Sequence, residues 1–93
     1  MKINDDDQLK ILREELDRID DQIAKLLFKR LEKSALIGKI KKSISINTYT
    51  PEREREILIR ITDLTLDKEQ KIHIKRIFER IIDESRAIQR KIK

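Results

Sequence analysis

The feature that most constrains the fold is an apolar seam that runs through an unusually long helical segment. Six apolar residues near the N-terminus recur at alternating spacings of three and four, at Leu9, Leu12, Leu16, Ile19, Ile23 and Leu26. This spacing is typical of a helix that packs against another helix. Helical spacing continues to about Ser43, with no proline and only Gly38 to weaken it. A helix of roughly 35 residues is about 50 Å long, so we expect a second copy of the chain to cover it in an intertwined homodimer.

The start and end of three helices can be predicted from local signals. Asp5, Asp6 and Asp7 are candidate N-caps of the long helix. Thr50 and Pro51 supply a capping hydroxyl and a proline at the first position of a second helix, which should run to about Thr62. That helix is expected to bury Ile57, Leu58 and Ile61.

Asp67 and Gln70 resemble a capping box that opens a third helix ending at about Ile92. Ser43 to Tyr49 is predicted to connect the first two helices, with Ile44 and Ile46 as possible anchors. The predicted fold class is therefore all-α, with three helices per subunit, one of them very long, in a single domain over residues 1–93.

The composition excludes several classes of protein. One glycine and one proline in 93 residues are too few turn residues for a sheet protein. Without cysteine there is no disulfide, thiol nucleophile or thiolate metal site, and His73, the one histidine, is expected to be an exposed helical residue. We therefore predict no metal site. The chain contains no apolar run long enough to span a bilayer and begins with a polar, acidic segment, so we expect a cytoplasmic protein that does not bind membranes.

The net charge of +5 raises the possibility of nucleic-acid binding. However, acidic and basic residues are interleaved almost everywhere, as in 51–56, which is typical of solvated helix faces. We expect no nucleic-acid partner. A small anionic substrate would also suit the sign of the charge.

Polar residues interrupt the apolar face of each predicted helix. In the third helix, Ser85 and Gln89 fall within an apolar stripe marked by Ile74, Phe78, Ile81, Ile88 and Ile92. In the first helix, Arg30 and Lys41 interrupt the seam. In the second helix, Glu54 lies on the same face as Leu58 and Ile61. Each has an ordinary explanation: a basic side chain can extend to solvent, Glu54 can pair with a nearby cation, Ser85 can bond to the backbone, and Gln89 can be exposed. Together they indicate one internal polar site, because buried polar groups need partners.

Arg13 and Arg30 lie about 25 Å apart along one helix. A single chain cannot easily bring both to one small ligand, but an antiparallel partner helix could place Arg13 of one subunit beside Arg30 of the other. Arginines suit carboxylates, Lys41 and Gln89 donate hydrogen bonds, and Glu54 can accept one from a hydroxyl. No nucleophile–base pair or phosphate loop is evident. The set fits a rearrangement within one hydroxylated dicarboxylate.

The pattern resembles the all-helical chorismate mutase family over essentially the whole chain. The residues that carry the resemblance are 12–20, Arg30, 38–41, 51–54 and 81–89, in that order and spacing. The resemblance implies a homodimer with two shared sites that converts chorismate to prephenate without a cofactor.

The resemblance also implies a role for each site residue. Arg13 of the partner and Arg30 would bind the carboxylates, and Lys41 and Gln89 would flank the ether oxygen. Glu54 would accept from the ring hydroxyl, Arg53 would support that end, and Ser85 would assist at a carboxylate. Some relatives carry an aspartate where this chain has Thr50, whose role in the site is left open.

Two alternatives remain. An isochorismate-pyruvate lyase on the same fold would share the arginines, lysine and glutamine, but Glu54 favours the mutase because members of that branch tend to lack this glutamate. A non-enzymatic helical dimerisation or nucleic-acid-binding module would explain the seam and the net charge. It would not explain polar residues at core-facing positions.

Overall fold

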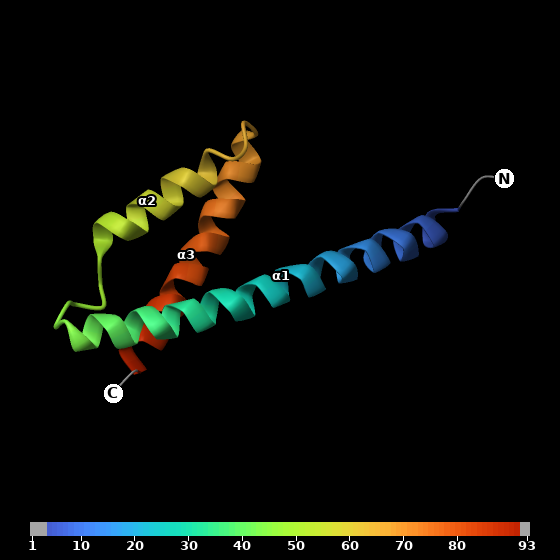
Figure 1. Ribbon diagram of the computed structural model, residues 1–93. Helices are drawn as coiled ribbons and strands as arrows, with labels where there is room; N and C mark the ends of the chain where they lie inside the picture. The colour runs from blue at the N-terminus through green and yellow to red at the C-terminus, as the bar shows by residue number, and fades with distance from the viewer. Residues whose placement is uncertain (1–3, 92–93) are drawn as a thin grey trace. The chain divides into compact units, whose positions relative to one another are not determined.

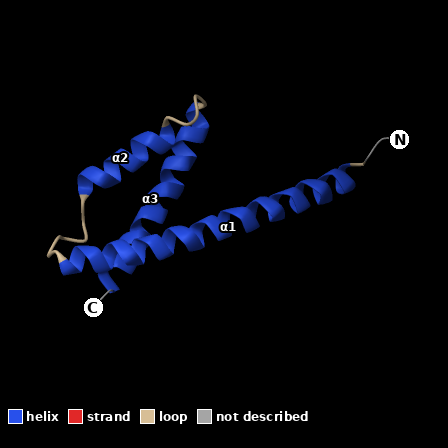
Figure 2. Ribbon diagram, viewed as in Figure 1, coloured by secondary structure: helices blue, strands red, loops and turns tan. Residues whose placement is uncertain are grey.

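The computed structural model describes residues 4–91, and in that part of the chain it contains helices and loops without a strand (Figures 1 and 2). The helices are α1 (Asp5–Ser43), α2 (Pro51–Thr62) and α3 (Lys68–Lys91). The all-α class and the three predicted helices are confirmed. The predicted end of the third helix at Ile92 lies outside the described residues.

The start of α1 differs from the prediction, because Asn4 provides the cap. Its side-chain oxygen Oδ1 accepts a hydrogen bond from the backbone N–H of Asp7 at 2.8 Å. The prediction that Asp5, Asp6 or Asp7 caps the helix was therefore wrong. All three lie in the first turn of α1, where carboxylates stabilise the positive end of the helix dipole.

The C-terminus of α1 is closed by a turn in which Ser45 adopts a left-handed conformation, with φ of 59°. The N–H of Ile46 donates to the carbonyl of Lys41 at 2.8 Å, and the N–H of Ser45 donates to that of Lys42 at 3.3 Å. This pair of bonds is the Schellman arrangement, in which glycine is the usual left-handed residue. Ile44 and Ile46 are 57% and 50% exposed, so they do not anchor the connector.

The two shorter helices begin differently. Thr50 makes no side-chain capping bond, so the predicted capping hydroxyl was wrong, although Pro51 does occupy the start of α2. The carbonyl of Thr50 accepts from the N–H of Glu54 at 3.2 Å. At α3 the predicted cap is confirmed, because Oδ1 of Asp67 accepts from the N–H of Gln70 at 3.0 Å.

The rest of the predicted capping box is replaced by contacts with Thr65. The hydroxyl of Thr65 donates to Oε1 of Gln70 at 2.7 Å and accepts from the N–H of Asp67 at 3.2 Å. The glutamine side chain therefore supports the cap through Thr65 instead of bonding to the backbone of Asp67.

The chain divides into two compact units, Met1–Arg30 and Leu31–Lys93. In the second unit α2 packs against α3 (Figure 1). The most buried apolar side chains are Ile57 of α2 and Ile82 of α3, at 8% and 5% exposed. Burial of Ile57 was predicted, and Leu58 and Ile61 are partly buried. Ile82 was not among the predicted stripe residues, of which Ile74, Phe78, Ile81 and Ile88 are partly buried.

In the first unit the predicted seam of Leu9, Leu12, Leu16, Ile19, Ile23 and Leu26 is between 46% and 65% exposed. None of the described helices is long and apolar enough to cross a membrane.

Candidate active site

A polar contact between α1 and α3 lies in the second unit. The hydroxyl of Ser34 donates to that of Ser85 at 3.0 Å, and both residues are buried, at 5% and 7% exposed. Gly38, one turn after Ser34, is also buried, and a residue without a side chain leaves room for a facing helix. Burial of Ser85 was predicted. Ser34 was missed, although it lies seven residues before Lys41 and therefore on the same helical face.

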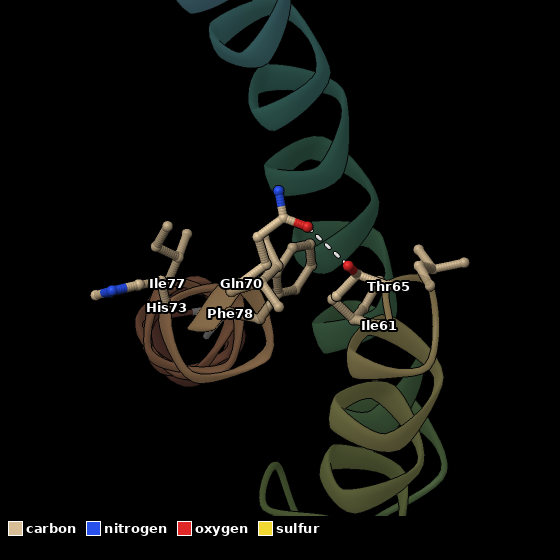
Figure 3. Close-up of a pocket in the computed structure, with 8 residues that line it drawn as sticks. Ile61, Thr65, Gln70, His73, Ile77 and Phe78 are labelled. Atoms are coloured by element: carbon tan, nitrogen blue, oxygen red, sulfur yellow. Dashed lines mark hydrogen bonds between the residues drawn. The ribbon is translucent and has the colours of Figure 1, made fainter. Parts of the chain in front are cut away.

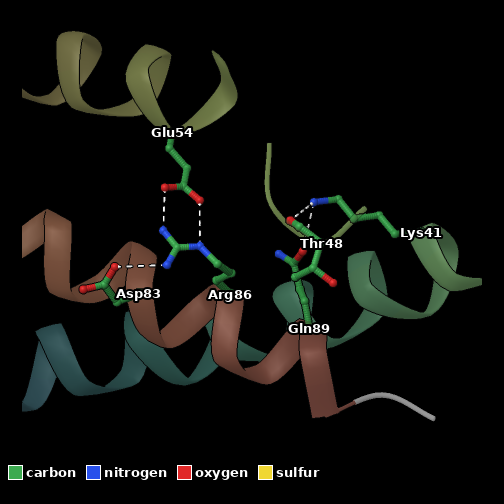
Figure 4. Close-up of polar contacts among 6 residues, drawn as sticks. All are labelled: Lys41, Thr48, Glu54, Asp83, Arg86 and Gln89. Atoms are coloured by element: carbon green, nitrogen blue, oxygen red, sulfur yellow. Dashed lines mark hydrogen bonds and ion pairs between the residues drawn. The ribbon is translucent and has the colours of Figure 1, made fainter. Parts of the chain in front are cut away.

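Lys41 and Gln89 form a second contact between the same two helices. Nζ of Lys41 donates to Oε1 of Gln89 at 3.0 Å and to the backbone carbonyl of Thr48 at 2.9 Å (Figure 4). An ammonium group can only donate, so the amide oxygen of Gln89 must face it. The amide nitrogen of Gln89 is then the atom that can donate to a ligand. Both side chains are partly buried, as predicted.

Glu54 on α2 is held by Arg86 on α3. Nη2 of Arg86 donates to Oε1 of Glu54 at 2.6 Å, and Nε donates to Oε2 at 3.0 Å (Figure 4). The side chains are 21% and 22% exposed. The ordinary explanation considered for Glu54, a pair with a nearby cation, therefore applies, and its partner is Arg86. Arg86 was not among the predicted site residues.

Two other groups surround Arg86. Its Nη1 lies 3.4 Å from Oδ1 of Asp83, and its Cζ lies 5.2 Å from the centre of the Tyr49 ring. The hydrogen bonds to Glu54 raise the pKa of Arg86 above its ordinary value. Burial opposes this rise, and the negative charges of Glu54 and Asp83 add to it. The guanidinium is therefore firmly charged within this cluster.

The three remaining predicted residues are arginines. Arg53 is 60% exposed and pairs with Glu56 at 3.3 Å, as expected of a surface residue. Arg13 is exposed and Arg30 is partly buried. Both lie on the continuous helix α1, where seventeen positions correspond to about 25 Å.

An apolar groove of about 500 Å³ lies elsewhere in the second unit and contains none of the predicted site residues (Figure 3). It is lined by Ile61, Leu64, Thr65, Gln70, His73, Ile74, Ile77 and Phe78. His73 is exposed, as predicted. Among the described residues no group of three or more histidine or acidic side chains could hold a metal ion.

The geometry therefore provides a charged donor at Lys41, an oriented amide donor at Gln89 and a carboxylate acceptor at Glu54. Comparison with known proteins identifies the family to which these residues belong. The family model described as "Chorismate mutase type II" matches residues 12–90. This chain belongs to the chorismate mutase type II family.

Members and relatives of that family match most of this chain. A bifunctional chorismate mutase/prephenate dehydratase of Aquifex aeolicus is 37% identical over 94% of this chain, which spans 25% of that protein. A chorismate mutase of Methanocaldococcus jannaschii is 33% identical, and the alignment covers 90% of this chain and 86% of that protein.

The fold is also shared with a solved structure. The structure of a form II chorismate mutase from Thermus thermophilus is similar with a TM-score of 0.84 and 26% identity, covering 90% of this chain and 96% of the other. The predicted resemblance to the all-helical chorismate mutase family and the predicted all-α fold are both confirmed.

Proposed function

We propose that this chain is a chorismate mutase, an isomerase that converts chorismate to prephenate in the biosynthesis of phenylalanine and tyrosine. The observation that carries the proposal is the contact between Lys41 and Gln89, at 3.0 Å and partly buried. In a member of the chorismate mutase type II family, two adjacent donors at these positions suit an ether oxygen that gains negative charge. The proposal treats residues 1–93 as one catalytic domain.

The proposed reaction is a cyclic rearrangement within one molecule. The carbon–oxygen bond of the enolpyruvyl ether breaks while a carbon–carbon bond forms between the enolpyruvyl arm and the ring. No proton, electron pair or group leaves the molecule, so the residues need not act as acid, base or nucleophile. Their task is to hold the flexible arm over the ring in a reactive geometry, which lowers the entropic part of the barrier.

Lys41 and Gln89 would stabilise the charge that develops on the ether oxygen. Donors fixed in place before the reaction need little reorganisation, and one such donor is typically worth about 2.7–4 kcal/mol. Glu54 would accept a hydrogen bond from the ring hydroxyl. Arg30, Ser85 and Arg13 of the partner subunit would bind the carboxylates, and Arg53 would support the hydroxyl end.

We further propose that the active form is a homodimer whose two sites are shared between subunits. The exposed seam of α1 supports this proposal, as does the roughly 25 Å between Arg13 and Arg30. Burying the remaining half of one leucine or isoleucine side chain contributes roughly 1 kcal/mol. Six such residues from each subunit therefore contribute on the order of 12 kcal/mol, comparable with an association cost of about 4–15 kcal/mol.

We place the enzyme in the cytoplasm, with chorismate as its small-molecule partner and without a cofactor, a nucleic-acid partner or a membrane surface. Thr50 makes no capping bond with its side chain. A contact between its hydroxyl and the substrate ring is therefore compatible with its position before α2.

The test is to incubate the purified, EDTA-treated chain with chorismate and to identify the product by chromatography. We expect prephenate. A lyase on the same fold would instead release pyruvate from isochorismate, so both substrates are supplied in parallel. A folded dimer that leaves chorismate unchanged would refute the proposed activity.

Subunit exchange tests the shared site separately. Arg13→Ala and Arg30→Ala are each expected to be nearly inactive, because each site needs both arginines. In a mixed dimer both lesions fall in one site and the other site is intact. An equal mixture should then regain about a quarter of the wild-type rate, since half of the dimers are mixed and each has one working site. No recovery after confirmed exchange would contradict this arrangement.

A further inference from the structure

Arg86 is the most completely engaged charged side chain in the candidate site. Two of its nitrogens donate to the two oxygens of Glu54, at 2.6 and 3.0 Å, and a third lies 3.4 Å from Asp83. Cζ of the guanidinium lies over the ring of Tyr49, 5.2 Å from its centre. Two parallel hydrogen bonds to Glu54 fix the guanidinium in position and angle (Figure 4).

This arrangement determines what Glu54 can do. A carboxylate has about four acceptor positions, and the fork of Arg86 occupies one on each oxygen. The side chain of Glu54 remains 22% exposed, so it can accept a further hydrogen bond from a molecule at its open side. With one position on each oxygen accepting from Arg86, the carboxylate of Glu54 still offers acceptor positions to a ligand.

The same contacts determine what Arg86 cannot do. Its charge faces the carboxylates of Glu54 and Asp83, which together carry two negative charges at neutral pH. A guanidinium engaged in this way is poorly placed to bind the carboxylates of a substrate. Arg86 therefore differs from Arg13 and Arg30, to which we assign that task.

We propose that Arg86 is a positioning residue that gives the site its selectivity for a ring hydroxyl, acting entirely through Glu54. The inference rests on the proposed function, because it assumes that Glu54 meets the hydroxyl of chorismate. An ion pair elsewhere on α3 does not have this character. Arg80 and Glu84, also on α3, form a single 2.8 Å contact with side chains that are 76% and 52% exposed.

A double-mutant cycle separates action through Glu54 from an independent effect. The kinetic constants kcat and KM for chorismate are measured for wild type, Arg86→Met, Glu54→Ala and the double variant. Arg86→Met should lower kcat/KM by about 10–100-fold, because a small displacement of a contact group has effects of that size. The double variant should be no slower than Glu54→Ala alone, since Arg86 then has nothing left to position.

Selectivity provides a readout that a purely structural role would not change. The second substrate is chorismate whose ring hydroxyl is methylated and cannot donate. Wild type should strongly prefer chorismate, and Arg86→Met should reduce that preference by about tenfold or more, since a site that bonds a hydroxyl discriminates against analogues without it. Arg80→Met is the matched control and should change neither rate nor preference by more than about twofold.

The outcomes are distinct. If wild type does not convert chorismate, the proposed function and this inference both fail. If wild type is active but the two losses multiply in the double variant, or if Arg86→Met keeps the full rate or the full preference, the inference alone is overturned. If Arg86→Met does not fold, Arg86→Lys takes its place in the cycle. Lysine keeps the charge but cannot form two parallel bonds to Glu54, so the same losses are expected.

Discussion

The two compact units of this chain contribute different features to the molecule. In Met1–Arg30 six leucine and isoleucine residues of one helical face are about half exposed. In Leu31–Lys93 the polar side chains instead pair with one another, as Lys41 does with Gln89 and Glu54 with Arg86. No buried side-chain nitrogen or oxygen of the described residues lacks a hydrogen-bond partner.

This difference indicates that the two units have different roles. The second unit already holds Lys41, Gln89 and Glu54 in fixed contacts, so its part of the candidate site is organised within one chain. The first unit presents an apolar surface whose burial requires another surface, and we have proposed a second copy of the chain.

The largest effect is expected from a charge in the seam. Leu16→Glu would place a carboxylate in an apolar interface, at a cost of several kcal/mol unless it finds a partner. We expect the variant to be monomeric at micromolar concentration in sedimentation velocity, with activity reduced by about 10³-fold or more. Asp21→Lys, which changes a charge on the opposite face of α1, is the control. A dimeric and active Leu16→Glu would show that the seam is not the subunit interface.

Loss of the charged donor should have the next largest effect. Lys41→Ala removes the ammonium group that contacts both Gln89 and Thr48, and we expect kcat/KM to fall by about 10²–10³-fold or more. Lys42→Ala, at the exposed neighbouring position, should retain nearly the full rate. Circular dichroism at equal concentration establishes that both variants fold. Equal rates for the two variants would remove Lys41 from the site.

The sequence was sufficient to predict the helices because their signals were strong and local. The extent of α1 followed from the apolar seam and from the absence of proline before position 51. The start of α3 followed from the carboxylate of Asp67. Individual caps were less predictable. Thr50 and Asp67 both precede a helix, yet only Asp67 bonds through its side chain, since capping depends on backbone angles and rotamers. At α1, Asn4 provides the cap although three aspartates follow it directly.

The candidate site residues were chosen where a polar side chain lay on an apolar face. Ser85, Gln89, Lys41 and Glu54 were predicted in this way, and the structure confirms that each of them is partly or fully buried. Their partners were harder to predict. Arg86 and Ser34 are recognised only once α3 is placed beside α2 and α1, because pairing across helices depends on how the helices pack. Arg53 and Arg13 are exposed, and their roles depend on what binds to this chain.

The orientation of the Gln89 amide leads to a smaller, pH-dependent effect. In Gln89→Glu one carboxylate oxygen still accepts from Lys41, but the other cannot donate to the ether oxygen until it is protonated. A carboxyl group gains its proton as pH falls through its pKa, ordinarily about 4.3 for glutamate. We expect about a tenfold or greater loss at pH 7.5 that diminishes as pH is lowered toward 5. Wild type should vary little between about pH 6 and 8.

Rates are measured across this range with wild type as the control for substrate and protein stability. A flat profile at the full rate for Gln89→Glu would mean that the amide does not face the breaking bond. The donor role would then be left to Lys41 alone.

The smallest effect concerns the turn that leads from Lys41 to Thr48. Ser45 is the one described residue other than glycine with a positive φ, at 59°, and a left-handed residue with a side chain costs about 1–2 kcal/mol. Ser45→Gly should therefore raise the free energy of unfolding by about 1 kcal/mol, measured by urea denaturation at a fixed chain concentration. Ser43→Gly, in the last turn of α1, is the matched control and should be destabilising, because glycine is unfavourable within a helix.

The wild-type turn already holds the carbonyl of Thr48 at 2.9 Å from Nζ of Lys41, so Ser45→Gly should leave kcat within about twofold of wild type. A stability gain with unchanged kcat would mean that the strain at Ser45 is not needed to position Lys41. A large loss of kcat would show instead that the exact course of this turn contributes to catalysis.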